Sequence, residues 1–439
     1  MIEFNPNKSI KAGVICPQPD NGVQMLTAQS RLKEAEGLAR AINLEIVYAE
    51  NSRIKEIKSA TYFSKGWIER VKPILAEKEA ELVVVDAKLS PIQQRNLERE
   101  LNLKVIDRTA LILEIFGERA QTREGVLQVE LAHLTYQRSR LVRSWTHLER
   151  QRGGAGFLGG PGETQIELDR RLIDDKIVRI KKELEKVKQT RGIQRGARRK
   201  VPYPVVALVG YTNAGKSTLF NYLTQSHVIV ADMLFATLDP TMRKVKLPSG
   251  TDIIFSDTVG FISDLPHELV MAFRATLEEV LAADVILHVR DASNSDFTAQ
   301  GQDVLEVLAH LGLKEIEQSD YYVEVFNKAD LLLAEEKQYF QAKCAKSSNQ
   351  VLISAQSGEG TDYLLKLIES KLLSAHQKMT VALPVSEGKL AAWLYQNSQV
   401  LQLENQEKEN IYSINISAQN RAKLIKLTEN NEAVKIRKA

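Results

Sequence analysis

Short apolar runs alternate with amphipathic stretches through the first hundred residues of the chain. The runs are rich in Val and Ile and span residues 12–16, 44–49, 81–87 and 103–107. Between them, stretches such as 30–42 and 66–80 place apolar residues at the spacing of a helix. Strands of this composition separated by helices are typical of a parallel sheet. The pattern therefore predicts a small α/β unit over residues 1–107.

A different pattern begins at Arg108, where the amphipathic segments become long. They are interrupted at residues 153–165, which contain six glycines and one proline, a composition that cannot sustain a helix. A second charged helix is predicted over 166–192, followed by a basic linker at 195–200. Two long helices joined by a glycine-rich loop predict an antiparallel helical hairpin within residues 108–200.

Alternating strands and helices return over residues 201–375 and predict a sheet that is mostly parallel. The remaining segment, 376–439, has a shorter α/β pattern that we expect to close with a helix. A chain of 439 residues is too long for one ordinary core, so several domains are expected. The predicted fold class is therefore α/β, with two small α/β units flanking the hairpin and the larger domain.

Composition excludes several classes of protein. The two cysteines, Cys16 and Cys344, lie far apart and lack C-x-x-C spacing, which argues against a disulfide framework or a zinc site. Buried free thiols in a reducing compartment are the ordinary interpretation. No targeting signal and no run of about 18 apolar residues occur. We therefore expect a soluble, cytoplasmic protein without a membrane span.

The strongest chemical signal is a G-x-x-x-x-G-K-S loop that lies between an apolar strand and a predicted helix. Backbone N–H groups of such a loop bind phosphates at close approach, and the helix N-terminus adds its positive end. Lys216 is expected to reach the β- and γ-phosphates, and the Ser217 hydroxyl to bind Mg²⁺. The predicted nucleotide contacts here are Gly210, Tyr211, Thr212, Asn213, Ala214, Gly215, Lys216, Ser217 and Thr218.

A second motif selects the base. Asn327, Lys328 and Asp330 form N-K-x-D at the end of an apolar strand. The Asp330 carboxylate can accept hydrogen bonds from N1–H and the exocyclic N2–H of guanine, whereas adenine would leave it buried and unpaired. Asn327 and Lys328 are expected to brace this loop. Ser354 and Ala355 follow a later strand and are expected to place a backbone N–H at the guanine oxygen.

Between these motifs, Asp257, Thr258, Val259 and Gly260 form D-x-x-G at the end of another strand. Asp257 is expected to hold Mg²⁺ through water, and the Gly260 amide to contact the γ-phosphate. The intervening loop, 234–241, offers Thr237 or Thr241 as a further Mg²⁺ ligand. We choose Thr237 because its surroundings resemble the F-T-T-L-x-P pattern of related GTPases.

Two residues bear on catalysis. Many GTPases place a glutamine directly after the D-x-x-G glycine to orient the attacking water, but this chain has Phe261, which cannot form that hydrogen bond. Intrinsic hydrolysis should therefore be slow, and the sequence leaves the catalytic residue unidentified. Asn213 matches an asparagine of potassium-activated GTPases. It is equally well explained as a turn residue, so a K⁺ requirement stays open.

Positive charge is concentrated before the nucleotide-binding domain, although the net charge of the chain is only +3. The segment from Leu134 to Lys200 has 18 lysines and arginines against 8 aspartates and glutamates. Arginines beside an aromatic residue can bind phosphates and stack on unpaired bases of RNA. A solvated basic face is the alternative interpretation. The candidate RNA-binding residues are Arg138, Arg140, Arg143, Trp145, Arg150 and Arg152.

Four strings in the chain resemble the HflX-type GTPases of the OBG-HflX group. They are RSWTHLERQRGGAGFLGGPGETQIELDRR, LSPIQQRNLE, DRTALILEIF and TREGVLQVELA. The resemblance covers essentially the whole chain. It implies a cytoplasmic GTPase that binds the large ribosomal subunit and its RNA and separates stalled or idle ribosomes under stress. We expect the free protein to be monomeric. It places the hairpin tip, 153–162, near the peptidyl-transferase region.

Two other functions fit the same motifs. One is a GTPase that assists ribosome assembly or RNA modification, and the other is a regulatory switch with a protein partner. Family members have been associated with ATP use through the N-terminal part, but no second phosphate loop occurs in this sequence.

Overall fold

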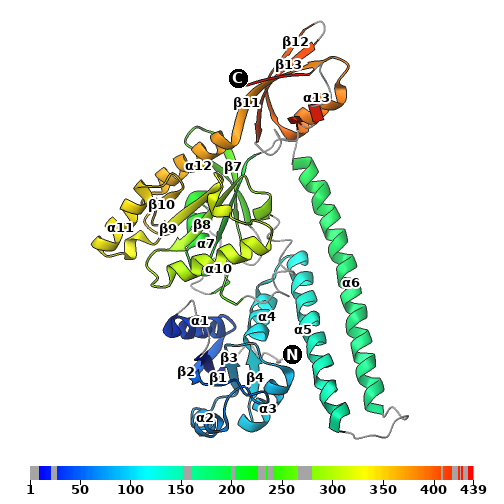
Figure 1. Ribbon diagram of the computed structural model, residues 1–439, viewed down its shortest axis with the longest axis vertical. Helices are drawn as coiled ribbons and strands as arrows, with labels where there is room; N and C mark the ends of the chain where they lie inside the picture. Colours follow the sequence, from blue (N-terminus) through cyan, green and yellow to red (C-terminus); the bar gives the residue numbers. More distant parts are fainter. Residues whose placement is uncertain are drawn as a thin grey trace.

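A computed structural model shows three β-sheets placed one after another along the long axis of the molecule (Figure 1). The structure describes residues 9–20, 27–151, 161–198, 203–225, 234–235, 241–264, 279–406, 409–417, 424–425, 427–428 and 434–438. The predicted fold class is confirmed: a small parallel α/β unit and a helical hairpin precede a parallel-rich sheet, and a small sheet domain follows it.

The N-terminal sheet has four parallel strands in the order β2-β1-β3-β4. Its strands are β1 (Ile10–Pro19), β2 (Leu44–Ile54), β3 (Leu82–Val85) and β4 (Lys104–Asp107). Its helices are α1 (Ala28–Ala41), α2 (Lys65–Glu77), α3 (Pro91–Leu101) and α4 (Arg108–Arg119). Strands β1 and β3 are apolar and buried in the middle of the sheet because helices cover both of its faces.

The predicted helical hairpin consists of α5 (Arg123–Gln151) and α6 (Pro161–Arg198). Leu127 and Leu134 of α5 pack against apolar residues of α6, and Arg138 forms an ion pair with Asp174 at 2.8 Å. Both boundaries of the second helix were predicted wrongly. It begins at Pro161 because proline suits the first turn of a helix, where no N–H partner is needed. It also continues through much of the predicted basic linker.

The central sheet has six strands in the order β10-β9-β8-β5-β7-β6, all parallel except β6. The strands are β5 (Val205–Gly210), β6 (Thr241–Lys246), β7 (Asp252–Asp257), β8 (Val285–Asp291), β9 (Tyr322–Asn327) and β10 (Gln350–Leu352). The helices are α7 (Lys216–Thr224), α10 (Phe297–His310), α11 (Ala334–Ala345), α12 (Thr361–Ala375) and the short 3-10 turns η1 (Ile316–Gln318) and η2 (Ala329–Leu331). The carboxyl ends of β5, β7, β9 and β10 meet at one edge, where ligands bind in such sheets.

The C-terminal sheet is antiparallel, with the order β12-β13-β11-β14. Its elements are β11 (His376–Pro384), α13 (Gly388–Asn397), β12 (Gln399–Asn405), β13 (Glu409–Ser417) and β14 (Lys435–Lys438). Residues 424–425 and 427–428 are helical, which agrees with the predicted helix, but a strand follows them because the last described residues form β14. That strand is short and charged, and its sequence lacks the apolar run that would have revealed it.

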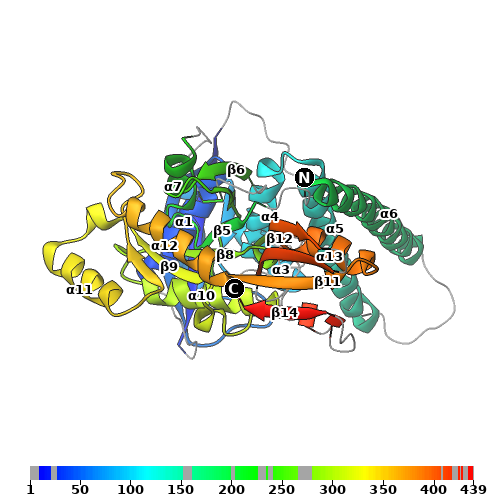
Figure 2. The same ribbon diagram turned by 90° about the horizontal axis from the view of Figure 1, so that it is seen from above.

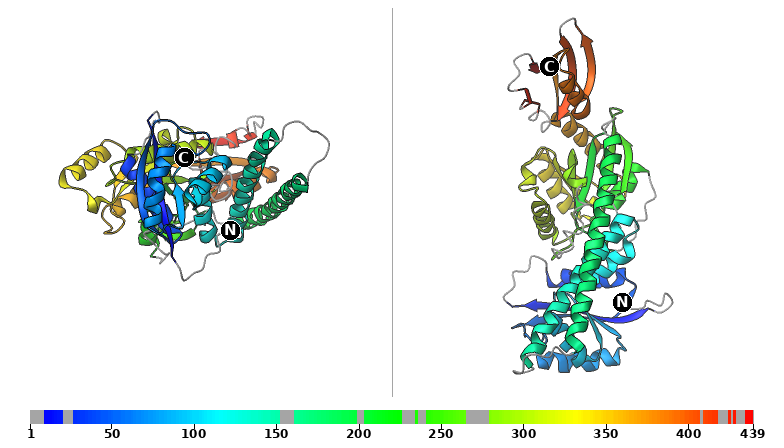
Figure 3. Two further views of the ribbon diagram at one scale, coloured as in Figure 1. Left: turned by 90° about the horizontal axis from the view of Figure 1, so that it is seen from below. Right: turned by 90° about the vertical axis from the view of Figure 1, so that its right-hand side faces the viewer.

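The hairpin lies to one side of the stacked sheets when the molecule is seen from above (Figure 2). The side view shows that the end where α5 stops and α6 begins is far from the C-terminal sheet (Figure 3). The N-terminal and central domains share one apolar cluster, to which α1, α4 and α10 all contribute. The central domain, which contains the predicted phosphate loop, is therefore in direct contact with the N-terminal unit.

Candidate active site

The loop between β5 and α7 has the backbone shape that phosphate binding requires. Gly215 has φ +90°, and a Cβ there would lie 2.2 Å from Nδ2 of Asn327. Gly210 is equally constrained, because its Cβ would lie 2.2 Å from the carbonyl oxygen of Val289. No side chain caps the N-terminus of α7, so the first N–H groups of this helix can receive a phosphate.

Lys216 is buried inside this loop. Its Nζ donates to the carbonyl oxygens of Gly210 and Tyr211, at 3.0 and 2.7 Å. Burial lowers the pKa of Lys216 to about 8, and the nearby Asp257 carboxylate opposes this shift. A triphosphate would replace neutral carbonyl acceptors by charged oxygens, which bind an ammonium more strongly.

Ser217 and Asp257 form a pair of oxygen ligands suited to Mg²⁺. The Ser217 hydroxyl donates to Oδ2 of Asp257 at 2.8 Å, and Asp257 is fully buried at the end of β7. A hydroxyl and a carboxylate are the hard donors that Mg²⁺ takes beside phosphate oxygens and water. Thr237, our predicted further ligand, lies outside the described residues. Thr241 begins β6 and pairs with Asp257 across the sheet.

Within the described part of the chain, no group of three or more His, Cys, Asp or Glu side chains is arranged to hold a metal ion. The fit to Mg²⁺ therefore rests on Ser217 and Asp257 together with the phosphates that a nucleotide would supply.

The D-x-x-G segment lies directly against the phosphate loop. The Thr212 N–H donates to the carbonyl oxygen of Phe261 at 2.7 Å, and the Phe261 N–H donates to Gly210 at 3.1 Å. A Cβ at Gly260 would lie 2.8 Å from Cγ2 of Thr212 and 3.1 Å from Nζ of Lys216. This close approach places the Gly260 amide beside the lysine expected to hold the γ-phosphate. Thr258 and Val259 are buried, and the Thr258 hydroxyl donates to the Leu208 carbonyl at 2.5 Å.

The residues predicted to select guanine come together at the ends of β9 and β10. Asn327 braces the phosphate loop by donating to the Ala214 carbonyl at 2.9 Å. Ser354 Oγ donates to Oδ1 of Asp330 at 2.5 Å, which orients the carboxylate. The Ala355 N–H donates to Oδ1 of Asn327 at 2.9 Å, so its contact with the guanine oxygen stays a prediction.

Three other predicted residues occupy distinct places. Lys328 has φ +66° and forms an ion pair with Asp291 at 2.7 Å, which fixes the N-K-x-D turn. Asn213 is exposed with φ +60°, a conformation that asparagine tolerates in turns, so both explanations of this residue stay open. Thr218 is half-buried in the first turn of α7.

The phosphate loop also touches the N-terminal domain through the side chain of Tyr211, a residue that was predicted only as a nucleotide contact. The Tyr211 hydroxyl donates to the Glu34 carboxylate of α1 and lies 3.0 Å from the Ser263 hydroxyl. The Ser263 N–H in turn donates to the Tyr211 oxygen at 2.9 Å. Burial and the Glu34 charge raise the pKa of Tyr211 well above its usual range, so the phenol stays protonated.

Arg108 joins the same contact from the first turn of α4. It is 3% exposed, lies 2.5 Å from Glu34 in an ion pair, and donates to the Ser263 carbonyl at 2.7 Å. Its other nitrogen pairs with Asp86, a buried residue at the end of β3. Burial disfavours the charged guanidinium, but Asp86 and Glu34 raise the pKa of Arg108 well above its usual range.

Arg31 extends the network on the N-terminal side. It bridges Asp86 and Asp264, with both ion pairs at 2.8 Å. The phosphate loop, the D-x-x-G segment and the N-terminal domain are thus joined by charge-assisted hydrogen bonds, which are buried around Arg108 and exposed at Asp264. We call Arg31, Glu34, Asp86, Arg108, Tyr211, Ser263 and Asp264 the interdomain network.

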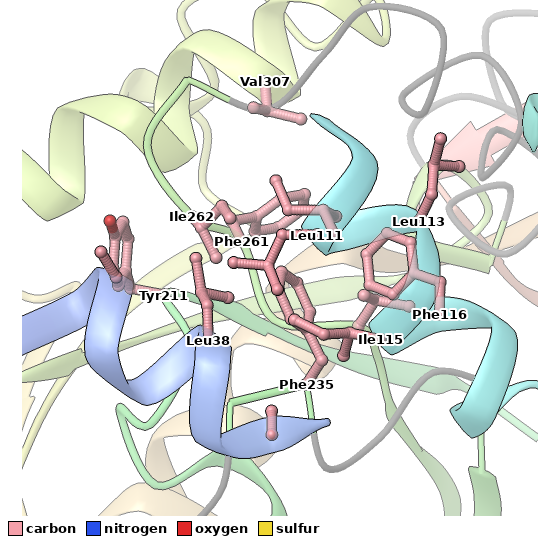
Figure 4. Close-up of a cluster of buried hydrophobic side chains, with 14 of the residues drawn as sticks. Leu38, Leu111, Leu113, Ile115, Phe116, Tyr211, Phe235, Phe261, Ile262 and Val307 are labelled. Carbon is pink, nitrogen blue, oxygen red and sulfur yellow. The ribbon is translucent and has the colours of Figure 1, made fainter. Parts of the chain in front are cut away.

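Phe261 points into the apolar cluster between the two domains (Figure 4). Its side chain is 2% exposed. Leu38 of α1, Leu111 and Phe116 of α4, and Val307 of α10 belong to the same cluster. The rings of Phe116 and Phe235 meet edge to face with centroids 4.7 Å apart. The prediction that Phe261 cannot orient water agrees with this position.

The candidate RNA-binding arginines differ in their surroundings. Arg140 is held inside the N-terminal unit by Asp107 at 2.6 Å and lies over the Tyr136 ring. Arg138 is 44% exposed and pairs with Asp174. Arg143, Trp145 and Arg150 lie on α5 beyond the described side chains, and Arg152 lies outside the described residues. Their contact with RNA stays a prediction.

Known protein families match the chain in four consecutive segments. They are described as GTP-binding GTPase N-terminal (29–117), GTP-binding GTPase Middle Region (119–198), 50S ribosome-binding GTPase (205–328) and HflX C-terminal domain (339–431). No helix in the described ranges has the length and apolar character needed to cross a membrane.

Individual relatives align over most of their length. GTPase HflX of Magnetococcus marinus is 49% identical over 379 residues, covering 86% of this chain and 86% of the relative. GTPase HflX of Escherichia coli is 42% identical over 385 residues, covering 88% of this chain and 89% of the relative. The crystal structure of a GTP-binding protein from Sulfolobus solfataricus in complex with GDP aligns with a TM-score of 0.44 and 23% sequence identity. The alignment covers 82% of this chain and 98% of that protein.

Proposed function

This chain belongs to the HflX family of GTPases, and on that premise we propose that it binds the large ribosomal subunit and separates stalled or idle ribosomes under stress. It binds GTP and hydrolyses it to GDP and phosphate, as the family does. The ribosomal role is the proposal, and it includes a cytoplasmic location and a monomeric free form.

Hydrolysis depends on positioning more than on covalent chemistry by the protein. Lys216 and the N–H groups of the phosphate loop hold the β- and γ-phosphates, while Asp330 selects guanine. The Gly260 amide contacts the γ-phosphate. We propose that Ser217, Asp257 and Thr237 hold Mg²⁺, which when bound neutralises charge on the phosphate oxygens.

The ribosomal proposal rests mainly on the match of residues 205–328 to a family described as a 50S ribosome-binding GTPase. The shape of the molecule supports it. The α5–α6 hairpin runs along one side of the N-terminal unit, and the later part of α6 continues beside the nucleotide-binding domain (Figure 1). The hairpin carries the densest positive charge of the chain. A long basic projection suits contact with ribosomal RNA, whose backbone is a dense array of phosphates.

The hairpin is also connected to the nucleotide site. Helix α5 packs against α4, which begins with Arg108, and Arg108 donates to Ser263 after the D-x-x-G segment. We propose that docking of the hairpin orders the loops at 234–241 and 257–266 and thereby raises the rate of hydrolysis, because positioning carries most of phosphoryl-transfer catalysis.

The proposal is tested by measuring GTP turnover during a titration with purified large subunits, small subunits and whole ribosomes. Large subunits should stimulate the wild-type protein, and the stimulation should fall steeply with added salt as phosphate contacts are lost. Sedimentation of whole ribosomes with the protein and GTP then shows whether they separate into subunits.

Charge reversal identifies the docking element. Arg143→Glu with Arg150→Glu should abolish stimulation and leave intrinsic turnover unchanged, since both residues lie outside the nucleotide site. The matched control is Arg179→Glu with Lys182→Glu, the same change of charge farther from the tip on α6, where Arg179 is 81% exposed. Equal stimulation of both double variants would show that the half of α5 nearer the hairpin tip is not the docking element. If the protein binds only to intermediates of ribosome assembly, a role in assembly would take the place of the proposed role in ribosome separation.

A further inference from the structure

The hydroxyl of Thr212 is a buried polar group without a partner among the described residues. Thr212 is only 7% exposed, and its position is fixed because its N–H donates to the Phe261 carbonyl at 2.7 Å. Buried hydroxyls in folded proteins nearly always form hydrogen bonds, so one that does not calls for an explanation. A ligand that is bound during the reaction is one such explanation.

The location of Thr212 points to that ligand. A Cβ built at Gly260 would touch both Cγ2 of Thr212 and Nζ of Lys216, at 2.8 and 3.1 Å. The Thr212 side chain therefore lies within a few ångströms of the ammonium that holds the γ-phosphate and of the amide that contacts it. Lys216 is bonded to the carbonyl oxygens of Gly210 and Tyr211, and a bound triphosphate would compete with these acceptors for the ammonium.

Neighbouring hydroxyls already have other partners. Ser217 donates to Asp257, Thr258 donates to the Leu208 carbonyl, and Ser263 is bonded to Tyr211. The position that supplies a glutamine in many GTPases is Phe261, which is buried in the interdomain cluster. Thr212 is thus a residue beside Gly260 whose buried hydroxyl has no partner among the described residues.

We propose that Thr212 is a catalytic residue of GTP hydrolysis, whose hydroxyl contacts the γ-phosphoryl group and the attacking water. A hydroxyl can donate one hydrogen bond and accept others, so it can donate to a γ-phosphoryl oxygen while it accepts from water. The water oxygen forms a bond to the γ-phosphorus as the bond from that phosphorus to the β–γ bridging oxygen breaks. The electron pair stays on GDP, and the proton of the water leaves with the inorganic phosphate.

The experiment compares two substitutions of nearly the same size. Thr212→Val keeps the shape and removes the hydroxyl, whereas Thr212→Ser keeps the hydroxyl. Single-turnover hydrolysis of preloaded GTP by the chain alone should slow by about tenfold or more in Thr212→Val. It should stay within about threefold of wild type in Thr212→Ser. Affinity for GDP, which lacks the γ-phosphate, should be unchanged in both.

Controls separate this role from support of the loop. Thr224→Val removes a hydroxyl that bonds the Phe220 carbonyl within α7, and it should hydrolyse GTP at the wild-type rate. Thermal unfolding shows that each variant is folded. The proposal is overturned if Thr212→Val hydrolyses normally, if Thr212→Ser is as slow as Thr212→Val, or if GDP affinity falls by the same factor as the rate.

Discussion

The two sides of the phosphate loop are held in different ways. On the nucleotide side, Lys216, Ser217 and Asp330 belong to short motifs and are predicted to contact the ligand. On the other side, Tyr211 meets Glu34 and Arg108, which come from a separate domain and act on the protein itself. We infer that the first set determines which nucleotide binds and the second holds the two domains together. Substitutions in the two sets should therefore have separable effects.

The largest effect is expected at the guanine-selecting residue. Asp330→Asn replaces a hydrogen-bond acceptor by an amide, which suits the C2 carbonyl of xanthine better than the exocyclic amine of guanine. We expect the preference for GTP over XTP to change by roughly 10⁴-fold, as for sites built around a substrate hydrogen bond. Competition binding measures the preference. The free energy of unfolding should not change. An unchanged preference for GTP over XTP would show that Asp330 does not contact the base.

The next effect is expected in the interdomain network. Arg108→Met should lower the free energy of unfolding by about 3 kcal/mol, because it leaves Glu34 and Asp86 buried with an ion-pair partner missing. Urea denaturation measures this change. The affinity of the folded protein for GTP should stay within about threefold of wild type.

The control for Arg108 is Arg40→Met on α1. Arg40 is 61% exposed and pairs with Glu36 on the surface, so its loss should cost under about 1 kcal/mol. If Arg108→Met weakens GTP binding as strongly as it weakens folding, the proposed separation of the two sides is wrong.

Sequence reasoning reached the nucleotide side because its residues stand at fixed spacings next to strand ends. Lys216 and Asp330 could be assigned from such spacings. The interdomain network has no comparable signal: Tyr211 and Glu34 are 177 positions apart, and Arg108 and Ser263 are 155 apart. Their meeting depends on how two domains pack, which local patterns do not encode. A charged residue such as Arg108 also looks like an ordinary surface residue in a sequence.

A pH effect of intermediate size is expected at Lys216. Its pKa is about 8 in the free protein, and bound phosphates should raise it. Affinity for GTP should then be full below about pH 8 and fall by up to about tenfold per pH unit above it, because binding requires uptake of a proton. Calorimetry in buffers of different ionisation enthalpy measures that uptake. Lys216→Ala should bind weakly and without this pH dependence, and a flat wild-type profile between about pH 7 and 9.5 would contradict the assignment.

The smallest effect is expected for the hydrogen bond between Tyr211 and Glu34. Tyr211→Phe and Glu34→Gln should each destabilise the protein, and the double variant should be less destabilised than the sum by about 1 kcal/mol. A thermodynamic cycle from unfolding experiments measures this coupling energy. A coupling near zero would mean that the phenol and the carboxylate are adjacent without stabilising each other.

The cysteines have a practical consequence. Burial raises the pKa of Cys16 far above its usual range and that of Cys344 to about 11. The reactive thiolate is therefore scarce at neutral pH, and both sulfurs should react slowly with alkylating reagents. A cysteine introduced on the exposed face of α6, for example at Arg171, would be the dominant labelling site of the chain. The native protein is thus ready for fluorescence measurements of hairpin movement without removal of its own thiols.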